Sequence, residues 1–321
     1  MPPLAACAPM TAPDAHISAA HISAADVTGH ADPLSLLQDP DPVLAANKRL
    51  VFDMWRSVVN AGHVELAETM LTEGYRQHSP VLPTGRDAFR QIFSAVERRD
   101  IPPLVSPPLV AILAEGDLVV MALREGLTGP DGETYSSTHF NLFRVEGGRL
   151  AEHWHSVQAP PGPDLPPPGQ GGPWPVTGAT GTAQLALLAA QNPALAANKR
   201  LVFDALREVF EGGQQQAIER YFAPGYIEHD PNFASGNAGL QARAAAASGG
   251  TSPTLDAPLV AVVAQGDLVT LVTSREHPHP HREGASYTTT HFSMFRVANG
   301  RIAEHWSGEA RPGGMPAPYG N

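Results

Sequence analysis

Residues 138–155 read THFNLFRVEGGRLAEHWH, two runs of alternating apolar and polar residues on either side of Glu146-Gly147-Gly148. This alternation predicts two β-strands joined as a hairpin. A three-residue turn, with Gly148 in the left-handed conformation of a bulge, pairs Val145 with Arg149. We favour this register over a two-residue Gly-Gly turn, which would place His139 and His153 on opposite faces of the hairpin.

In the favoured register, polar side chains from both strands share one face. Asn141 lies opposite His153, and His139 lies opposite His155. The other face carries the apolar side chains Phe140, Leu142 and Trp154. Because buried polar groups rarely gather without partners, this convergence of imidazoles and an amide indicates a functional site.

The same pattern returns at residues 290–307, which read THFSMFRVANGRIAEHWS. Asn299-Gly300 is a stronger hairpin signal than Gly-Gly. The same register sets Ser293 opposite His305 and His291 opposite Ser307. The chain therefore contains a tandem duplication.

Each copy of the hairpin is preceded by the same series of predicted elements. A helix begins at Asp41-Pro42 and again at Asn192-Pro193, because Asp and Asn favour the N-cap and Pro favours the first helical position. A short helix, a short strand, a third helix and an apolar hairpin follow. Each copy is expected to form an α+β unit in which helices pack against one curved antiparallel sheet, with a pocket between them.

Composition marks the limits of the two units. Residues 1–33 have little apolar surface to offset the entropy of ordering and are expected to form a disordered tail. Residues 159–184 hold runs of Pro and Gly typical of a semi-extended linker. The predicted domains span residues 34–158 and 185–310, and residues 311–321 form a C-terminal tail.

Short motifs recur in the same order in both units: Tyr-x-x-His-x-Pro, Gly-Asp-Leu-Val and Phe-Arg-Val-x-x-Gly-Arg-x-x-Glu-His-Trp, with Gly-Arg-Asp-Ala-Phe in the first. Together they resemble SnoaL-like proteins of the nuclear transport factor 2-like superfamily, over most of both units. The resemblance implies two tandem cone-shaped α+β barrels, each with a deep apolar pocket. The superfamily includes polyketide cyclases, isomerases, epoxide hydrolases and noncatalytic binding proteins, so the fold alone chooses no reaction.

Two departures from the family pattern bear on the chemistry. SnoaL-like relatives commonly carry Asp where this chain has Asn141 or Ser293, and again where it has His155 or Ser307. The second of these positions resembles that of the cyclase's acid/base carboxylate. Because neither copy keeps a carboxylate at either place, a histidine is expected to carry any proton transfer.

The candidate site combines a histidine base with hydrogen-bond donors. His139 or His153 is expected to act as general base on an acidic carbon next to a carbonyl. Asn141 and Tyr75 are expected to donate hydrogen bonds to the oxyanion that develops. The full candidate set is His78, His139, His153, His155, Asn141 and Tyr75 in the first unit, and His229, His291, His305, Ser293 and Tyr226 in the second.

Three classes of function stay open. The first is a cofactor-independent enzyme of the cyclase, isomerase or hydrolase type that acts on a small apolar carbonyl compound. The second is a noncatalytic small-molecule binding protein. The third is a metal enzyme with Zn, Fe or Cu held by three histidines and an open position; its ligands are His78, His139 and His153, with His229, His291 and His305 in the second copy. The resemblance implies no metal, so we expect no cofactor.

Charge and composition limit the partners. With 21 Lys and Arg against 32 Asp and Glu, the net charge of −11 opposes binding to nucleic acid. No apolar run approaches the roughly 20 residues of a membrane helix, and the N-terminus lacks the basic region of a secretory signal. The only cysteine, Cys7, cannot form an intrachain disulfide. We expect a cytoplasmic protein that holds a small apolar molecule in one or both pockets, with no membrane partner.

The apolar face of each hairpin predicts how the two units meet. Many single-copy relatives pair through the outer face of the sheet, and the linker is long enough to allow the same within one chain. An intrachain pseudo-dimer is therefore expected, with further homo-oligomerisation left open. The side chains at this contact are Phe140, Leu142 and Trp154, with Phe292, Met294 and Trp306.

Overall fold

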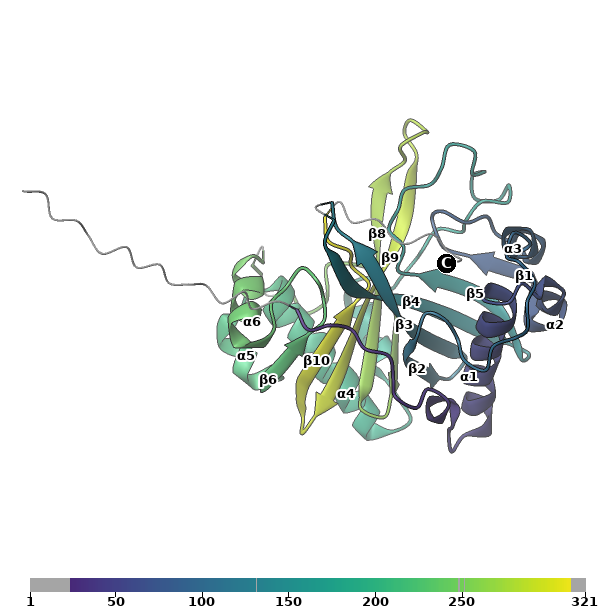
Figure 1. Ribbon diagram of the computed structural model, residues 1–321. Coiled ribbons are helices and arrows are strands. Elements are labelled where there is room, and N and C mark those ends of the chain that lie inside the picture. The colour runs from purple at the N-terminus through teal and green to yellow at the C-terminus, as the bar shows by residue number, and fades with distance from the viewer. Residues whose placement is uncertain (1–23, 131, 248, 251, 313–321) are drawn as a thin grey trace, which may run out of the picture.

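The computed structural model describes residues 24–130, 132–247, 249–250 and 252–312. It contains two α+β units, each with helices on one five-stranded sheet, which confirms the predicted fold class. Figure 1 shows the two sheets in the centre of the molecule, with the helices of each unit on the outer sides. We call the units repeat 1 and repeat 2.

Repeat 1 builds its helical layer before most of its sheet. Its helices are η1 (Ser35–Leu37), α1 (Pro42–Met54), η2 (Trp55–Val59), η3 (Val64–Leu66), α2 (Ala67–Met70) and α3 (Arg86–Phe93). Its strands are β1 (Leu71–Gln77), β2 (Leu109–Glu115), β3 (Leu118–Thr128), β4 (Thr134–Glu146) and β5 (Arg149–His155). The strand order is β1-β5-β4-β3-β2, and all neighbours are antiparallel except β1 and β5, which are parallel.

Repeat 2 follows the same plan. Its helices are η4 (Gly181–Leu188), α4 (Pro193–Ala205), η5 (Leu206–Glu211), η6 (Gln215–Ala217), α5 (Ile218–Tyr221) and α6 (Gly236–Ala245). Its strands are β6 (Phe222–Glu228), β7 (Leu259–Gln265), β8 (Leu268–Pro278), β9 (Ser286–Ala298) and β10 (Arg301–Ser307), in the order β6-β10-β9-β8-β7.

The first helix of each repeat begins where its sequence predicts. The Asp41 side chain accepts a hydrogen bond from the Val43 N–H at the start of α1, and Asn192 does the same for Ala194 at the start of α4. Both helices continue into a π-helical segment, η2 or η5, which widens the turn next to the concave face of the sheet. This brings Trp55 toward the interior of repeat 1.

The register of the decisive hairpin differs from the prediction. The turn has two residues, Gly147 and Gly148, both at positive φ, so Glu146 pairs with Arg149. The bulge lies two residues later, where Ala151 is inserted into β5 and moves the pairing to Phe143 with His153. The two-residue turn alone would have put His153 on the opposite face from His139. The bulge returns both side chains to the same face. The same correction applies to Asn299-Gly300 and Ala303 in repeat 2.

The outer faces of the two sheets pack against each other. One apolar cluster joins them and contains all six side chains expected at this contact: Phe140, Leu142, Trp154, Phe292, Met294 and Trp306. The Phe140 and Phe292 rings stack with centroids 5.4 Å apart and planes 2° apart. Separate apolar clusters fill the space between helices and sheet within each repeat. The molecule is therefore layered as helices, sheet, sheet, helices.

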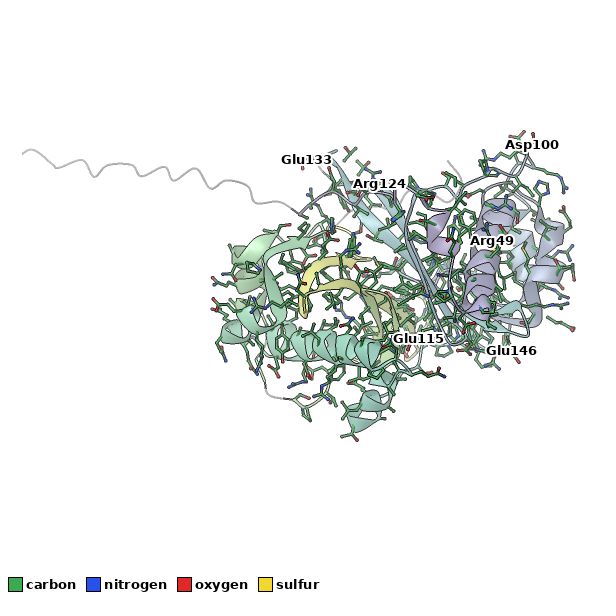
Figure 2. All side chains as sticks on the ribbon, turned by 90° about the horizontal axis from the view of Figure 1, so that it is seen from below. Arg49, Asp100, Glu115, Arg124, Glu133 and Glu146 are labelled. Carbon is green, nitrogen blue, oxygen red and sulfur yellow. The ribbon has the colours of Figure 1, made fainter. Side chains whose placement is uncertain are left out.

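Polar bonds between the repeats flank this apolar contact. Lys199 at α4 approaches Glu115 at the end of β2 to 2.6 Å, and the other Glu115 oxygen accepts from the Ala264 N–H. Figure 2 shows Glu115 beside the helix of the other repeat. At the pseudo-symmetric position, Gln265 accepts from the Ala114 N–H and from Lys48. These bonds fix the edges β2 and β7 side by side.

The prediction of a disordered N-terminal tail is wrong for residues 24–33. Val27 is fully buried, the Ala25 N–H donates to Glu228 in repeat 2, and the His30 N–H donates to Leu109 in repeat 1. Sequence composition did not predict this, because the segment is held by contacts with both repeats that are remote in sequence. Residues 1–23 lie outside the described residues.

The linker and C-terminal tail also lie against the repeats. The Trp174 N–H donates to the Gln77 carbonyl, and Ala179 bridges to Leu259. The predicted linker end at residue 184 falls inside η4. This helix precedes α4 in repeat 2 as η1 precedes α1 in repeat 1. Arg311 donates its N–H to the Tyr135 hydroxyl, and residues 313–321 lie outside the described part. Among the residues described, no helix is long and apolar enough to cross a lipid bilayer.

Candidate functional site

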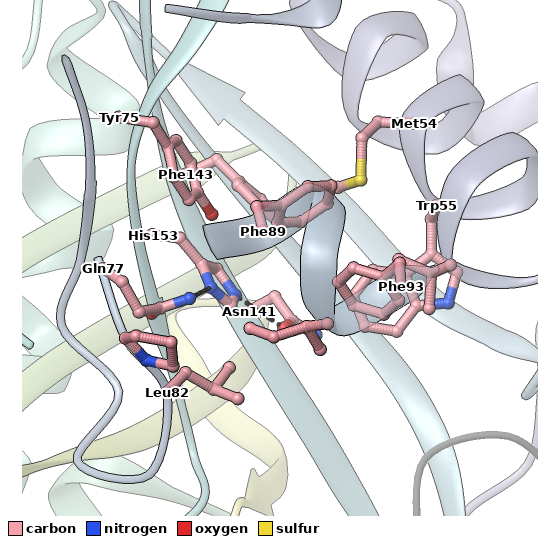
Figure 3. Close-up of a pocket in the computed structure, with 13 residues that line it drawn as sticks. Met54, Trp55, Tyr75, Gln77, Leu82, Phe89, Phe93, Asn141, Phe143 and His153 are labelled. Atoms are coloured by element: carbon pink, nitrogen blue, oxygen red, sulfur yellow. Dashed lines mark hydrogen bonds between the residues drawn. The ribbon is translucent and has the colours of Figure 1, made fainter. Parts of the chain in front are cut away.

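A pocket lies between the helices and the concave face of the sheet in repeat 1 (Figure 3). About 60 Å³ of it is open to the centre of a water molecule. Its walls are mostly apolar and include Met54 and Trp55 at the end of the first helix, Leu82, Phe89 and Phe93 around α3, and Phe143 on β4. Four polar side chains also face it: Tyr75, Gln77, Asn141 and His153.

Both ring nitrogens of His153 are engaged. Gln77 Nε2 donates to Nδ1 at 3.0 Å, and Nε2 donates to Asn141 Oδ1 at 2.9 Å. The orientation of the Gln77 amide is fixed because its oxygen accepts the Ser79 N–H. Burial, together with a smaller effect of the neighbouring His139, lowers the pKa of His153 to about 3. His153 is therefore a neutral ring that carries its proton on Nε2.

Two donors in the pocket have no partner. The Tyr75 hydroxyl and Asn141 Nδ2 are buried and bond to nothing in the described part of the chain. Burial raises the pKa of Tyr75, so its hydroxyl keeps its proton. A buried donor without a partner costs about 1–3 kcal/mol. Both atoms are therefore available to an acceptor that enters the pocket.

His139 and His155 share the concave face with His153. The ring centroids of His139 and His155 are 5.9 Å apart, and those of His153 and His155 are 5.5 Å apart. His155 Nε2 bonds to the Ser79 hydroxyl. Burial lowers the pKa of His139 to about 4, against a hydrogen bond with Asn141, and lowers that of His155 well below its usual value. All three imidazoles are neutral at pH 7.

His78 and His229 lie on the other face of the sheet, contrary to the prediction that each shares a cavity with the hairpin histidines. His78 stacks on Trp154 at 4.3 Å and bonds to Glu152 at 2.9 Å, and His229 stacks on Trp306 at 4.8 Å. The three-histidine arrangement is not assembled, and among the described residues no group of three His, Cys, Asp or Glu side chains could hold a metal ion.

Strand alternation explains the error. Tyr75 and His78 stand three residues apart, and in an extended strand an odd spacing puts them on opposite faces. The residue that shares the face of Tyr75 is Gln77, and its counterpart in repeat 2 is Glu228. Neither residue was among the predicted site residues, although strict alternation from the tyrosine identifies both.

The interior of repeat 2 is chemically different. Glu228 is 1% exposed and accepts hydrogen bonds from the Tyr226 hydroxyl at 2.6 Å and from His305 Nδ1 at 2.7 Å. Arg243, on α6, approaches Glu228 at 3.4 Å and stacks over Phe210. Burial raises the pKa of Glu228, but His305 and Arg243 outweigh it, so the pKa is lowered. Repeat 2 therefore places a carboxylate beside its histidine from a strand position that the sequence analysis did not consider.

His305 therefore carries its proton on the opposite nitrogen from His153. Its Nδ1 donates to Glu228, and its buried Nε2 has no hydrogen-bond partner among the residues described. The other candidates of repeat 2 lie farther along the strands. His291 bonds to Glu309 at 2.8 Å and to Thr289 at 3.0 Å, and Ser293 lies opposite Ser307.

Comparison with known proteins identifies the domain. A family model described as the SnoaL-like domain matches residues 52–153 and again residues 203–305. No curated protein sequence matches the chain significantly.

Three similar solved structures each cover about a third of this chain. A putative SnoaL-like polyketide cyclase from Jannaschia sp. CCS1 is 20% identical, covers 37% of this chain and 89% of its own, and has a TM-score of 0.28. TsrD from Streptomyces laurentii is 17% identical over 37% of this chain and 90% of its own, with a TM-score of 0.26. IdmH, a putative polyketide cyclase from Streptomyces antibioticus, is 22% identical over 34% and 89%, with a TM-score of 0.25.

The two matched segments together span more than half of the chain and coincide with the two repeats. The chain therefore belongs to the SnoaL-like family and carries two tandem copies of its domain.

Proposed function

We propose that the pocket of repeat 1 binds a small, mostly apolar molecule through a carbonyl or similar acceptor group. The observation that carries this proposal is the pair of unpartnered donors, Tyr75 Oη and Asn141 Nδ2, on two residues that line a mostly apolar pocket. An acceptor oxygen of a ligand would satisfy such a donor, and the aromatic walls would cover the rest of the ligand.

The same two donors would stabilise negative charge on that oxygen. Hydrogen-bond donors held in a dry site favour an enolate or a tetrahedral oxyanion, the charge that forms in cyclase, isomerase and hydrolase reactions. Proton removal also needs a base with a free lone pair. His153 offers none, because Gln77 already donates to its Nδ1. Repeat 1 on its own is therefore better suited to binding than to proton transfer.

Histidine-mediated acid/base catalysis in repeat 2 is the second candidate function. It is favoured by the bonding of His305, whose Nδ1 donates to Glu228 and whose Nε2 is buried without a partner in the described chain. A carboxylate behind an imidazole stabilises the imidazolium that forms when the far nitrogen takes a proton. Tyr226 and Arg243 bring further donors to the same carboxylate.

Binding in repeat 1 can be tested with cyclohexanone and a hydrocarbon of the same shape, methylenecyclohexane, by calorimetric or NMR titration. Tyr75→Phe and Asn141→Leu should each weaken cyclohexanone binding by roughly 2- to 10-fold, the worth of one hydrogen bond, and should leave the hydrocarbon unaffected. Tyr226→Phe is the matched control, because that hydroxyl is already bonded to Glu228. Equal loss for both ligands would contradict the role of the donors.

The same samples separate a binder from an enzyme. An enzyme that removes an α-proton exchanges the α-hydrogens of cyclohexanone with deuterium oxide, which NMR follows directly. His305→Gln should lower that exchange by about 10² to 10⁴, the usual contribution of a general base, whereas His153→Gln should not. Binding without exchange would leave repeat 1 as a noncatalytic site. Exchange that survives His305→Gln would exclude the second candidate.

A further inference from the structure

A second cavity lies between the repeats and shares no lining residue with the first. About 310 Å³ of it is open to the centre of a water molecule. One side is formed by Glu125, near the end of β3, and by Ser137 and His139, near the start of β4. The segments that leave β5 and β10 form the other, with Val157 and Gln158 from repeat 1 and Ala310 and Arg311 from repeat 2.

The pseudo-symmetry of the molecule relates this cavity, beside His139, to a position beside His291 that side chains fill. The Ser156 N–H donates to Phe140 as the Gly308 N–H donates to Phe292, so Val157 corresponds to Glu309 and Gln158 corresponds to Ala310. In the sheets, His139 lies opposite Leu123 as His291 lies opposite Thr273. The surroundings of His139 can therefore be compared with those of His291 residue by residue.

Two side chains fill the space beside His291. Glu309 Oε1 lies 2.8 Å from His291 Nδ1, and Gln158 Nε2 lies 3.3 Å from the same atom. Beside His139 the corresponding residues are Val157 and Ala310, which are shorter and carry no polar group. The cavity exists because these two side chains do not reach across it.

The cavity also carries the opposite charge from the corresponding position beside His291. The ladder pairs Glu125 with Ser137 in repeat 1 and Arg275 with Thr289 in repeat 2, so a carboxyl group replaces a guanidinium. No lysine or arginine forms an ion pair with Glu125 within the described residues; His139 Nδ1 lies 3.9 Å from its carboxyl group. Burial lowers the pKa of His139 to about 4, so that ring supplies no positive charge at pH 7.

The remaining cation of the lining is already engaged. The Arg311 guanidinium donates to the Pro231 carbonyl, lies 3.5 Å from Glu133 and stacks on the Tyr135 ring at 4.7 Å. Burial without a cation raises the pKa of Glu125 to about 7. The Ser137 hydroxyl donates to the Glu309 carbonyl and keeps its lone pairs for a donor that enters the cavity. The cavity thus offers the acceptors Glu125 and Ser137, while the Arg311 guanidinium in its lining is bonded to other groups.

We propose that this cavity between the repeats is a second ligand site, which takes a small organic ammonium ion that pairs with Glu125 and donates to Ser137. The ammonium supplies the charge that Glu125 lacks, and its organic part occupies the space that longer side chains fill beside His291. The net charge of −11 favours the approach of such a cation. The site is separate from the repeat 1 pocket and does not depend on the function proposed for it.

Calorimetric titration of the full chain with benzylamine at about pH 8 tests the site, because there both the amine and Glu125 are charged. Benzyl alcohol and benzoate are the neutral and anionic probes of the same shape. Benzylamine should bind with a stoichiometry of one, and Glu125→Gln should weaken it at least 10-fold. Ala310→Gln, which introduces the side chain found beside His291, should block it. Glu146→Gln removes an exposed carboxylate elsewhere on β4 and should change nothing.

Three outcomes would overturn the proposal: no saturable binding of benzylamine by the wild-type chain, equal binding by the Glu125→Gln variant, or tighter binding of benzoate or benzyl alcohol than of benzylamine. Thermal unfolding of each variant shows whether a loss reflects the site or the fold. If Glu125→Gln does not fold, Ala310→Gln decides, because it leaves Glu125 in place and closes the space beside it.

Discussion

His153 and His305 stand in the same sequence, Glu-His-Trp, yet carry their protons on opposite nitrogens. The difference comes from one neighbour on the adjacent strand. Gln77 donates to Nδ1 of His153, whereas Glu228 accepts from Nδ1 of His305. The amide-to-carboxylate change thus moves the ring proton to Nδ1 of His305, and Ser293 in place of Asn141 leaves the basic Nε2 without a partner among the described residues.

The low pKa of His153 predicts a loss of stability in mild acid. Its pKa is about 3 in the folded protein and about 6.5 in the unfolded chain, so the unfolded state binds the proton first as the pH falls. The stabilising contribution is complete above about pH 6.5 and is lost toward the folded pKa. By about pH 5 this one ring should cost on the order of 2 kcal/mol of unfolding free energy.

Comparing urea unfolding of the wild type and His153→Gln at pH 7 and pH 5 isolates this term. Burial raises the pKa values of Glu125 and Glu211 to about 7, and these groups act in the opposite direction, but they are common to both proteins. The wild type should lose on the order of 2 kcal/mol more than the variant between the two pH values. Equal losses of unfolding free energy in the two proteins would mean that His153 is protonated in the folded state.

At the scale of elements, the turn and the bulge of each hairpin act together. A two-residue turn has the backbone twist that favours strand pairing, but it shifts the register by one residue and would face His153 outward. The bulge at Ala151, and at Ala303 in repeat 2, inserts one residue and reverses that shift. The concave face therefore depends on two irregular positions, one in the turn and one in the strand.

The two turns predict which glycine can be replaced. Gly147 has φ +56° and its counterpart Asn299 has φ 51°, so Gly147→Asn should keep the turn and raise the unfolding free energy by about 0.4–1 kcal/mol through a less flexible unfolded chain. Gly148→Ala should lower it by about 1 kcal/mol, because alanine disfavours φ +73°. A Cβ meets nothing within 4 Å at either glycine, so urea unfolding reports backbone preference alone.

At the scale of the molecule, the two repeats form one folded unit. Their sheets share an apolar cluster that includes Phe140 and Phe292, and the segments before each repeat cross to the other. Residue Val27, from the first of these segments, is fully buried. Removing one repeat would expose the outer face of the other to water.

Separate expression of residues 34–158 and 185–310 tests this dependence. Each half should self-associate through the exposed sheet face or unfold at lower denaturant than the full chain, because burial contributes roughly 25 cal/mol per Å² of apolar surface. Sedimentation velocity and urea unfolding measure the two effects. Halves that stay monomeric and as stable as the full chain would show that the contact between the sheets contributes little.

The sequence by itself was sufficient for the architecture. The duplicated hairpin, the Asp41-Pro42 and Asn192-Pro193 helix starts and the apolar outer face are local patterns, and each follows from periodicity, capping or turn chemistry that acts over a few residues. They predicted two α+β units and the side chains between the sheets. The order of motifs pointed to the SnoaL-like family, which the match to both repeats confirmed.

Only the tertiary structure decided the chemistry of the sites. The proton positions on His153 and His305 depend on Gln77 and Glu228, which are remote in sequence and become neighbours through the parallel pairing of the first and last strands. The cavity at Glu125 depends on the segment around Ala310, which belongs to the other repeat. Local patterns specify which way a side chain faces along its own strand, but hydrogen bonds, burial and charge at a site are set by residues that only the folded chain brings together.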